Sequence, residues 1–159
     1  MKFKGTLIAV SDIERSKVFY KAVLGLDVEA DFGTNVVLTG GVFLQTLETW
    51  RDLINKNDVS FYHNAVELYF EEDDFDGFTG KLDGVKFIHP PVEHTWGQRA
   101  VRFYDPDGHI IEVGENLFVV IRRFIDSGMT VAETADRMDV PVEYINNTLE
   151  NIAISRNED

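Results

Sequence analysis

The sequence predicts an α+β fold: two β-α-β-β-β units that form cupped mixed sheets, followed by a C-terminal helical tail. The first observation is that apolar segments repeat in the same order in two halves, over about residues 1–48 and 65–115. One repeated order of elements is typical of a duplicated unit. The second observation is that residues 116–159 carry apolar side chains at helical spacing only. We therefore expect one domain over residues 1–115 and a helical extension over residues 116–159.

The first half begins with an apolar strand over residues 3–10. Ser11, with Glu14 three residues later, predicts a capping box at the start of a helix. Gly25 can end this helix in a left-handed conformation. A connector after the half has room for a short helix. The three strands that complete the half are expected at residues 26–30, 35–39 and 42–47, with Gly40-Gly41 as a hairpin turn.

The second half repeats this order. Its last two strands are joined by Asp105-Pro106-Asp107-Gly108, in which proline fixes φ and glycine accepts a positive φ, as a tight turn requires. Alternation in the final strand directs Ile111 and Val113 to the helix-packed face and Glu112 to the opposite face. The expected elements are a strand at 66–71, a helix at 73–82 and strands at 85–88, 99–104 and 110–113.

The extension has the pattern of three helices. Gly128 ends the first, Thr130 and Glu133 cap the second, and Pro141 suits the first turn of the third, which carries Ile152 on its apolar face. The last two helices loosely resemble a helix-turn-helix. However, the extension holds four arginines and eight acidic residues, and DNA binding needs cations to neutralise phosphates. We therefore expect no nucleic-acid partner, and interpret the tail as a lid or a cap that stabilises a dimer.

Composition limits the remaining choices. The 159 residues include no cysteine, which excludes disulfides, thiolate metal sites and a cysteine nucleophile. With 15 basic and 28 acidic residues, the net charge of −13 disfavours nucleic acid and anionic lipid as partners. No apolar run approaches the roughly 20 residues of a membrane span. We expect a cytoplasmic protein without a membrane partner.

Three segments carry a resemblance to a known family. Residues 10–20 (VSDIERSKVFY), 96–99 (WGQR) and 102–112 (RFYDPDGHIIE) resemble the vicinal oxygen chelate superfamily, also called glyoxalase/bleomycin-resistance/dioxygenase. The resemblance implies a cavity where the β-α-β-β-β units face each other, a small-molecule ligand or substrate, and a homodimer. Because this superfamily includes lyases, isomerases, dioxygenases and binding proteins without catalysis, function has to be inferred from the site.

The resemblance also implies four metal-ligand positions, one on the first and one on the last strand of each half. Here they fall on Gly5, Gln45, Glu67 and Glu112. Glycine offers no side chain, and none of the four is histidine, so the set suits a weakly held Mn²⁺ or Mg²⁺ at most. We therefore expect no obligatory metal. The alternative role for Glu112 is an ion pair with Arg99 or Arg102, and for Glu67 an exposed position.

Other side chains are candidates for ligand contacts. By alternation Phe43 shares a face with Gln45, and Tyr69 shares a face with Glu67. The loop with His94 and Trp96 resembles the one bordering the superfamily cavity. The further candidates are Arg99, Arg102 and Tyr104. Other aromatic residues that could line a pocket include Trp50 and Phe61. The other histidines, His63, His89 and His109, have no metal-ligand spacing and are interpreted as surface or rim residues.

Three functional hypotheses follow. The first is a cytoplasmic, dimeric binding protein for a small organic molecule, whose aromatic walls supply apolar contact. The second is a lyase, isomerase or dioxygenase that depends on a divalent metal held by Glu67 and Glu112, with Glu112 as the catalytic residue. The third is a regulator that acts through the helical tail. Whether the protein is an enzyme stays open at this point.

Overall fold

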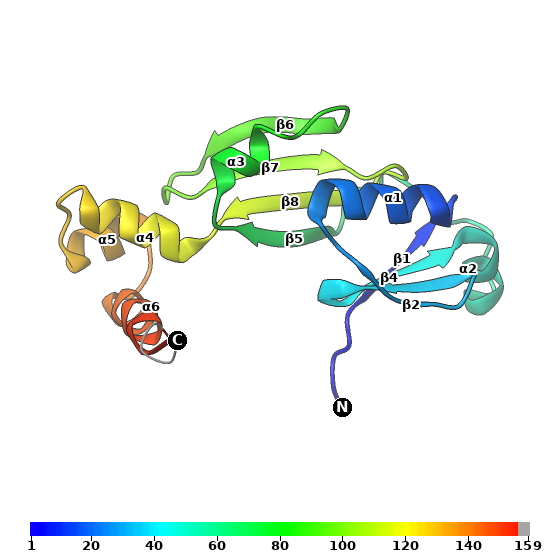
Figure 1. Cartoon of the computed structure of the whole chain (residues 1–159), viewed down its shortest axis with the longest axis horizontal. Coiled ribbons are helices and arrows are strands. Elements are labelled where there is room, and N and C mark those ends of the chain that lie inside the picture. The colour runs from blue at the N-terminus through cyan, green and yellow to red at the C-terminus, as the bar shows by residue number, and fades with distance from the viewer. Residues whose placement is uncertain (156–159) are drawn as a thin grey trace. The chain divides into compact units, whose positions relative to one another are not determined.

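A computed structural model describes residues 1–155, with side chains described as far as residue 150. It contains two four-stranded sheets with the same strand order, β1-β4-β3-β2 and β5-β8-β7-β6 (Figure 1). The predicted α+β fold with two β-α-β-β-β units is confirmed. The elements of the first half of the repeat are β1 (Thr6–Val10), α1 (Ile13–Leu24), β2 (Val28–Asp31), β3 (Asn35–Leu38), a 3₁₀ turn (Thr39–Gly41) and β4 (Val42–Thr46).

The first sheet is mixed, because β1 pairs with β4 in parallel whereas β3 pairs with β2 and β4 in antiparallel fashion. Ile8 lies opposite Leu44 in the β1–β4 ladder, and both are buried on the face that α1 covers. Tyr20 of α1 is fully buried. A short helix, α2 (Leu47–Ile54), follows β4 directly, as the connector allowed.

The start of α1 differs from the prediction. Asp12, not Ser11, caps the helix, and its carboxylate accepts a hydrogen bond from the Arg15 N–H. The Ser11 hydroxyl instead donates to the carboxylate of Asp107, far away in the sequence. Local spacing could not reveal this tertiary partner, which makes the predicted Ser11 capping box wrong. Gly25, at φ 70°, ends α1 in the left-handed conformation as predicted.

The second sheet differs from the prediction mainly in β6. This strand was expected over residues 85–88, but it runs over Lys86–Glu93 and includes Pro90-Pro91. β6 is an edge strand of this sheet. Prolines are tolerated there because one side of an edge strand needs no ladder hydrogen bonds. The helix predicted over residues 73–82 is confined to α3. The other elements of this half are β5 (Glu67–Glu72), α3 (Phe75–Thr79), β7 (Arg99–Tyr104) and β8 (Ile110–Glu115).

The extension forms the three helices that were predicted: α4 (Leu117–Asp126), α5 (Val131–Met138) and α6 (Val142–Ser155). Thr130 and Glu133 form a reciprocal capping box at α5, as predicted. A buried apolar cluster joins the helices, formed by Val120, Ile121, Phe124, Ala135, Met138 and Ile145. Ile152 lies outside the residues whose side chains are described. Among the described residues, no helix is long and apolar enough to cross a membrane.

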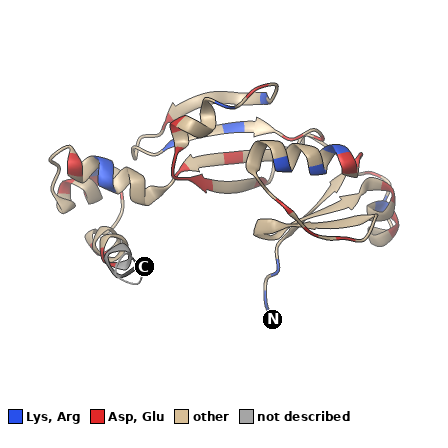
Figure 2. Ribbon diagram, viewed as in Figure 1, with Lys and Arg blue, Asp and Glu red and all other residues tan. Residues whose placement is uncertain are grey.

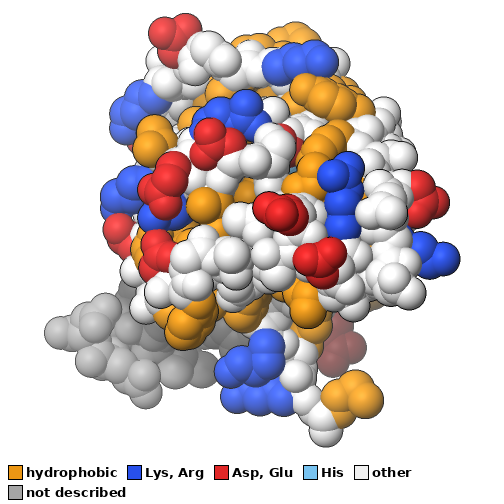
Figure 3. Space-filling view, turned by 90° about the vertical axis from the view of Figure 1, so that its right-hand side faces the viewer, with side chains coloured by type: hydrophobic (Ala, Val, Ile, Leu, Met, Phe, Trp, Pro, Cys, Tyr) orange, Lys and Arg blue, Asp and Glu red, His pale blue; other side chains and the backbone are white. Residues whose placement is uncertain are grey.

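The described residues group into two compact units. The first contains Met1–Leu68, Gly84–Lys86 and Phe103–Ile111, and the second contains Tyr69–Asp83, Phe87–Arg102 and the chain from Glu112 onward. Acidic and basic residues are distributed over strands and helices alike (Figure 2). On the face shown in Figure 3, hydrophobic side chains reach the surface between charged ones.

Candidate functional site

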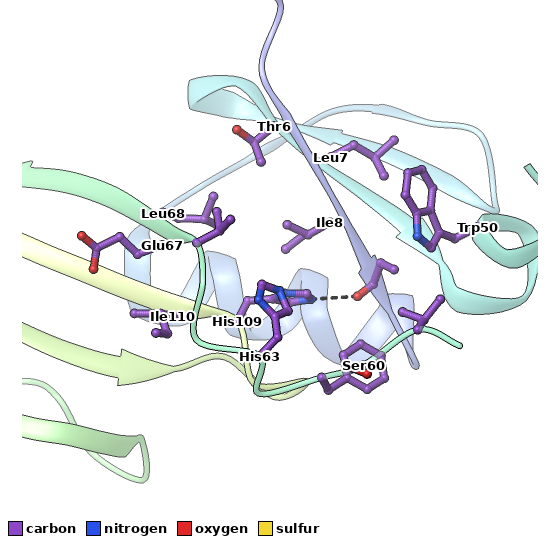
Figure 4. A pocket seen from close by; sticks show the side chains of 14 residues that line it. Thr6, Leu7, Ile8, Trp50, Ser60, His63, Glu67, Leu68, His109 and Ile110 are labelled. Atoms are coloured by element: carbon purple, nitrogen blue, oxygen red, sulfur yellow. Dashed lines mark hydrogen bonds between the residues drawn. The ribbon is translucent and has the colours of Figure 1, made fainter. Parts of the chain in front are cut away.

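The first unit contains a pocket of about 280 Å³ beside β1 (Figure 4). Most of its wall is apolar and comes from β1, α2, the connector before β5, and the beginnings of β5 and β8. Binding sites for small molecules typically combine such apolar walls with a few placed polar groups. The main apolar residues are Leu7, Trp50, Phe61, Val66, Leu68 and Ile110, and the polar ones are Thr6, Ser60, His63, Glu67 and His109.

Two imidazoles belong to this pocket, and the backbone orients both. His109 Nε2 lies 2.8 Å from the carbonyl oxygen of Ala9. His63 Nδ1 accepts a hydrogen bond from the Ala65 N–H at 3.2 Å. The Phe61 ring packs edge-to-face against His109, with 5.9 Å between ring centroids. His63 and His109 are therefore parts of the pocket wall with defined ring orientations.

Glu67 and Glu112 lie on the neighbouring strands β5 and β8, in different surroundings. Glu67 is an exposed residue that lines the pocket, and in Figure 4 its carboxylate extends away from the labelled histidines. The side chain of Glu112 is 7% exposed and forms an ion pair with Arg102. The sequence suggested an ion pair of Glu112 with either Arg99 or Arg102, and in the structure the partner is Arg102. That the two carboxylates form one site stays a prediction.

His89 supports the Arg102–Glu112 pair. His89 Nδ1 lies 2.8 Å from the carbonyl oxygen of Pro90. Because a carbonyl oxygen only accepts, Nδ1 carries the proton and donates a hydrogen bond to this oxygen. The lone pair of His89 Nε2 then accepts from Arg102 Nη1, at 3.4 Å. Arg102 is thus oriented by a carboxylate on one side and an imidazole on the other.

A hydrogen-bonded cluster on the same sheet connects two predicted ligand-contact residues, Tyr69 and Trp96, through Gln98. Gln98 Nε2 donates to the Tyr69 hydroxyl at 3.0 Å, and Gln98 Oε1 accepts from Trp96 Nε1 at 3.1 Å. Tyr69 in turn donates to Glu71 Oε1 at 2.9 Å. Tyr69 is partly buried, and this partial loss of water is the main cause that raises its pKa to about 12. Tyr69 therefore stays protonated at neutral pH and remains a hydrogen-bond donor.

His94 stacks on the Trp96 ring, with 4.3 Å between centroids and 14° between planes. Burial, followed by the charges of Arg102 and His89, lowers the pKa of His94. Its Nε2 is buried, and within residues 1–150 it has no hydrogen-bond partner. The neutral imidazole is therefore favoured, and it presents a flat apolar face to the indole.

The helical extension holds the loop that carries His94 and Trp96. Arg123 Nη2 of α4 donates to the Gly97 carbonyl at 2.6 Å and to Glu115 Oε2 at 3.1 Å. Phe124 packs so closely on Gly97 that a Cβ at this glycine would lie 2.2 Å from Phe124 Cζ. Contacts from the extension thus fix the loop, a role that the sequence pattern did not reveal.

The other predicted site residues have partners elsewhere. Arg99 pairs with Glu115 at 2.9 Å and with Asp76 of α3 at 2.7 Å, on the helix-packed side of the sheet. The Tyr104 hydroxyl donates to Asn64 at 2.8 Å.

Gln45 is buried. Its Oε1 accepts from Asn35 Nδ2 at 3.0 Å and its Nε2 donates to the Thr34 carbonyl at 2.7 Å. Phe43 is half-buried two residues earlier on the same strand. The amide of Gln45 is therefore already used within the first sheet.

Three of the four positions implied by the resemblance do not fit a bound metal, and Glu67 alone would be a weak site. A Cβ at Gly5 would lie 2.0 Å from the Gly41 carbonyl oxygen, so no ligating side chain has room there. Gln45 is hydrogen-bonded within its own sheet, and Glu112 is paired with a guanidinium. Among the described residues, no three His, Asp or Glu side chains are grouped as metal ligands.

The sequence predicts surface or rim positions for His63 and His109, and in the structure both line the pocket, with His63 exposed and His109 half-buried. Neither has metal-ligand spacing, and their contacts with the backbone of Ala65 and Ala9 depend on the fold. The available signal was aromatic: Trp50 and Phe61 were among the residues proposed for a pocket, and Phe61 is two residues before His63.

The paired β-α-β-β-β sheets and a small apolar pocket define a protein of the vicinal oxygen chelate type, and comparison with known proteins agrees. The family model described as "Glyoxalase-like domain" matches residues 3–118. The chain belongs to this family and, as the resemblance predicted, to the vicinal oxygen chelate superfamily. The match ends at the beginning of α4, before most of the extension.

Individual relatives are more distant. The chain is 27% identical over 108 residues to metallothiol transferase FosB of Lysinibacillus sphaericus, covering 67% of this chain and 76% of FosB. It is 28% identical over 108 residues to glutathione transferase FosA of Serratia marcescens, covering 67% and 74% respectively. A crystal structure of a protein of unknown function from Agrobacterium tumefaciens is similar, with 39% identity, a TM-score of 0.68 and coverage of 73% and 94%.

Proposed function

We propose that this chain binds a small organic molecule in the pocket beside β1, and that binding requires no metal. The observation that carries the proposal is the pocket, with aromatic and aliphatic walls and a few polar groups. Its volume of about 280 Å³ compares with the roughly 150 Å³ of an engineered apolar cavity that binds benzene. The pocket therefore has room for more than one aromatic ring.

The surroundings of Glu112 support independence from a metal. Its buried carboxylate already pairs with Arg102, and a metal ion would have to displace this guanidinium. The corresponding position of the first sheet holds Gln45, whose amide is already hydrogen-bonded within that sheet. Gly5, at the position that corresponds to Glu67, has no side chain and no room for one. Arg102 therefore provides the positive charge beside the Glu112 carboxylate that a metal ion would otherwise provide.

The cluster in the second unit is proposed as a second set of ligand contacts. Tyr69 and Trp96 are 49% and 38% exposed, so both rings are accessible. Gln98 and the stacked His94 hold the two rings in defined positions. Such pre-ordered aromatic side chains lose little conformational entropy when a ligand binds.

The test uses the two tryptophans, one in each candidate region. In W96F, Trp50 reports on the pocket, and in W50F, Trp96 reports on the second cluster. Naphthalene is titrated into both variants with EDTA present, and tryptophan fluorescence is recorded. We expect saturable quenching of Trp50 that is unchanged by EDTA. Absence of quenching, or quenching that needs added Mn²⁺, would contradict the proposal.

The alternative is a lyase, isomerase or dioxygenase that depends on a divalent metal. It is favoured by the similarity to FosB, whose name describes a metallothiol transferase. Electron paramagnetic resonance of added Mn²⁺ separates the hypotheses. Stoichiometric Mn²⁺ binding that is lost in E112Q supports the metal enzyme, whereas free Mn²⁺ signals in both proteins support the proposal above.

We also propose that the chain forms a homodimer, on the basis of the superfamily resemblance. The chain mass is 18.1 kDa. Size-exclusion chromatography with light scattering should therefore give twice this mass at micromolar concentration. A mass equal to that of one chain would overturn the dimer without affecting the ligand proposal.

A further inference from the structure

We propose that His63 and His109 select a neutral ligand whose polar group both donates and accepts a hydrogen bond, such as a hydroxyl on a two-ring aromatic compound. The proposal rests on the proposed function, because it names the ligand class of the same pocket. Figure 4 shows both imidazoles in the pocket wall.

The backbone fixes the proton positions of both rings. A carbonyl oxygen only accepts, so His109 Nε2, 2.8 Å from the Ala9 oxygen, must carry the proton. In the neutral ring, His109 Nδ1 is then the acceptor. His63 is the reverse case, because its Nδ1 accepts from the Ala65 N–H, which leaves Nε2–H as the donor. Of the two rings that line the pocket, His63 thus keeps one donor nitrogen and His109 keeps one acceptor nitrogen.

These fixed groups determine which polar substituents are recognised. A hydroxyl can accept from His63 and donate to His109, an ether oxygen can only accept, and a hydrocarbon can do neither. The hydroxyls of Thr6 and Ser60 also line the pocket. They rotate to suit any partner and so cannot discriminate among these substituents.

Charge and shape define the rest of the ligand. Glu67 at the pocket and the net charge of −13 disfavour an anionic ligand. Trp50 and Phe61 provide aromatic walls, which favour flat rings. With about 280 Å³, nearly twice the volume of a benzene-binding cavity, the pocket suits two fused rings.

The first experiment compares four probes on the unmodified protein by equilibrium dialysis: 2-naphthol, 2-methoxynaphthalene, naphthalene and 2-naphthoate. We expect 2-naphthol to bind roughly two- to tenfold more tightly than the ether, the range that one net hydrogen bond provides, and roughly five- to a hundredfold more tightly than the hydrocarbon, the range of two. The anion 2-naphthoate should bind most weakly. Equal affinities for 2-naphthol and naphthalene would overturn the inference but leave the proposed function intact. No binding of any probe would overturn both.

The second experiment assigns the selectivity to the two rings. H63F and H109F each keep an aromatic ring but remove the nitrogens. In each variant the preference for 2-naphthol over naphthalene should fall toward one, while naphthalene affinity changes less than twofold. An unchanged preference in both variants would overturn the inference. Because H109F also loses the bond to Ala9, far-UV circular dichroism confirms its fold, and H63F with the four-probe series keeps the inference testable if H109F does not fold.

Discussion

Replacing Glu115 with glutamine should destabilise the protein strongly, although glutamine has nearly the same shape. The Glu115 side chain is 1% exposed and joins β8 to two arginines. Arg99 donates to it from Nη2 at 2.9 Å and from Nε at 3.2 Å. Arg123 donates from Nη2 at 3.1 Å. The backbone N–H of Arg99 also donates to Oε2, at 3.4 Å. The substitution removes the negative charge that these four hydrogen bonds share.

The expected size follows from the burial of the partners. Breaking a buried ion pair costs about 3–5 kcal/mol. Here Arg99 and Arg123 are 29% and 37% exposed, and Arg99 keeps its contact with Asp76. Water and Asp76 therefore compensate in part, and we expect a loss of about 2–3 kcal/mol. For a chain of this size that corresponds to roughly 4–12 °C in Tm.

The loss should also depend on pH. Burial alone would raise the pKa of Glu115, but the hydrogen bond from Arg99 and the charges of both arginines outweigh it, so the pKa is lowered. The charge of Glu115 therefore contributes stability above the unfolded-state pKa near 4.5, and this contribution disappears as the pH falls through the lowered folded-state pKa.

Urea denaturation followed by circular dichroism, at pH 7 and at pH 3, measures both effects. The exposed Glu29 provides a matched control, because E29Q should stay within about 0.5 kcal/mol of the unmodified protein. Trp96 emission in a W50F background should shift to the red in E115Q, since Arg123 also holds the loop at Gly97. A loss below 0.5 kcal/mol at pH 7, or a loss that persists unchanged at pH 3, would refute this reasoning.

Three further predictions concern single residues. G97A should cost about 2–4 kcal/mol in urea denaturation, because φ is +87° and the new Cβ would meet the Phe124 ring; wild-type stability would contradict the close packing. Y20F should cost about 1–3 kcal/mol, since the buried Tyr20 hydroxyl donates to Asp105 at 3.0 Å; an unchanged midpoint would argue against this bond. Because the pKa of His94 is lowered, stability should fall as the pH drops below about 6.5, and H94Q should flatten this dependence; equal pH profiles would exclude His94 as the cause.

The sequence was most informative where the pattern is local. Alternation predicted Ile111 and Val113 on one face of β8 and Glu112 on the other; all three are buried, and Glu112 pairs with Arg102. The capping box at Thr130 formed as predicted. Ser11 has a similar local pattern, yet it bonds to Asp107 in the other half of the repeat. A local motif predicts a cap correctly only when no distant partner competes for the same side chain.

The sequence alone thus determined the duplicated fold and the three-helix extension, because hydrophobic periodicity and turn residues act between near neighbours. The resemblance of three segments indicated the family. The sequence also determined that Gly5 supplies no ligand. The tertiary structure decided which arginine meets Glu112, which backbone groups orient His63 and His109, and that α4 holds the loop of Trp96. Each of these depends on pairs of side chains or backbone atoms that only folding brings within hydrogen-bond distance.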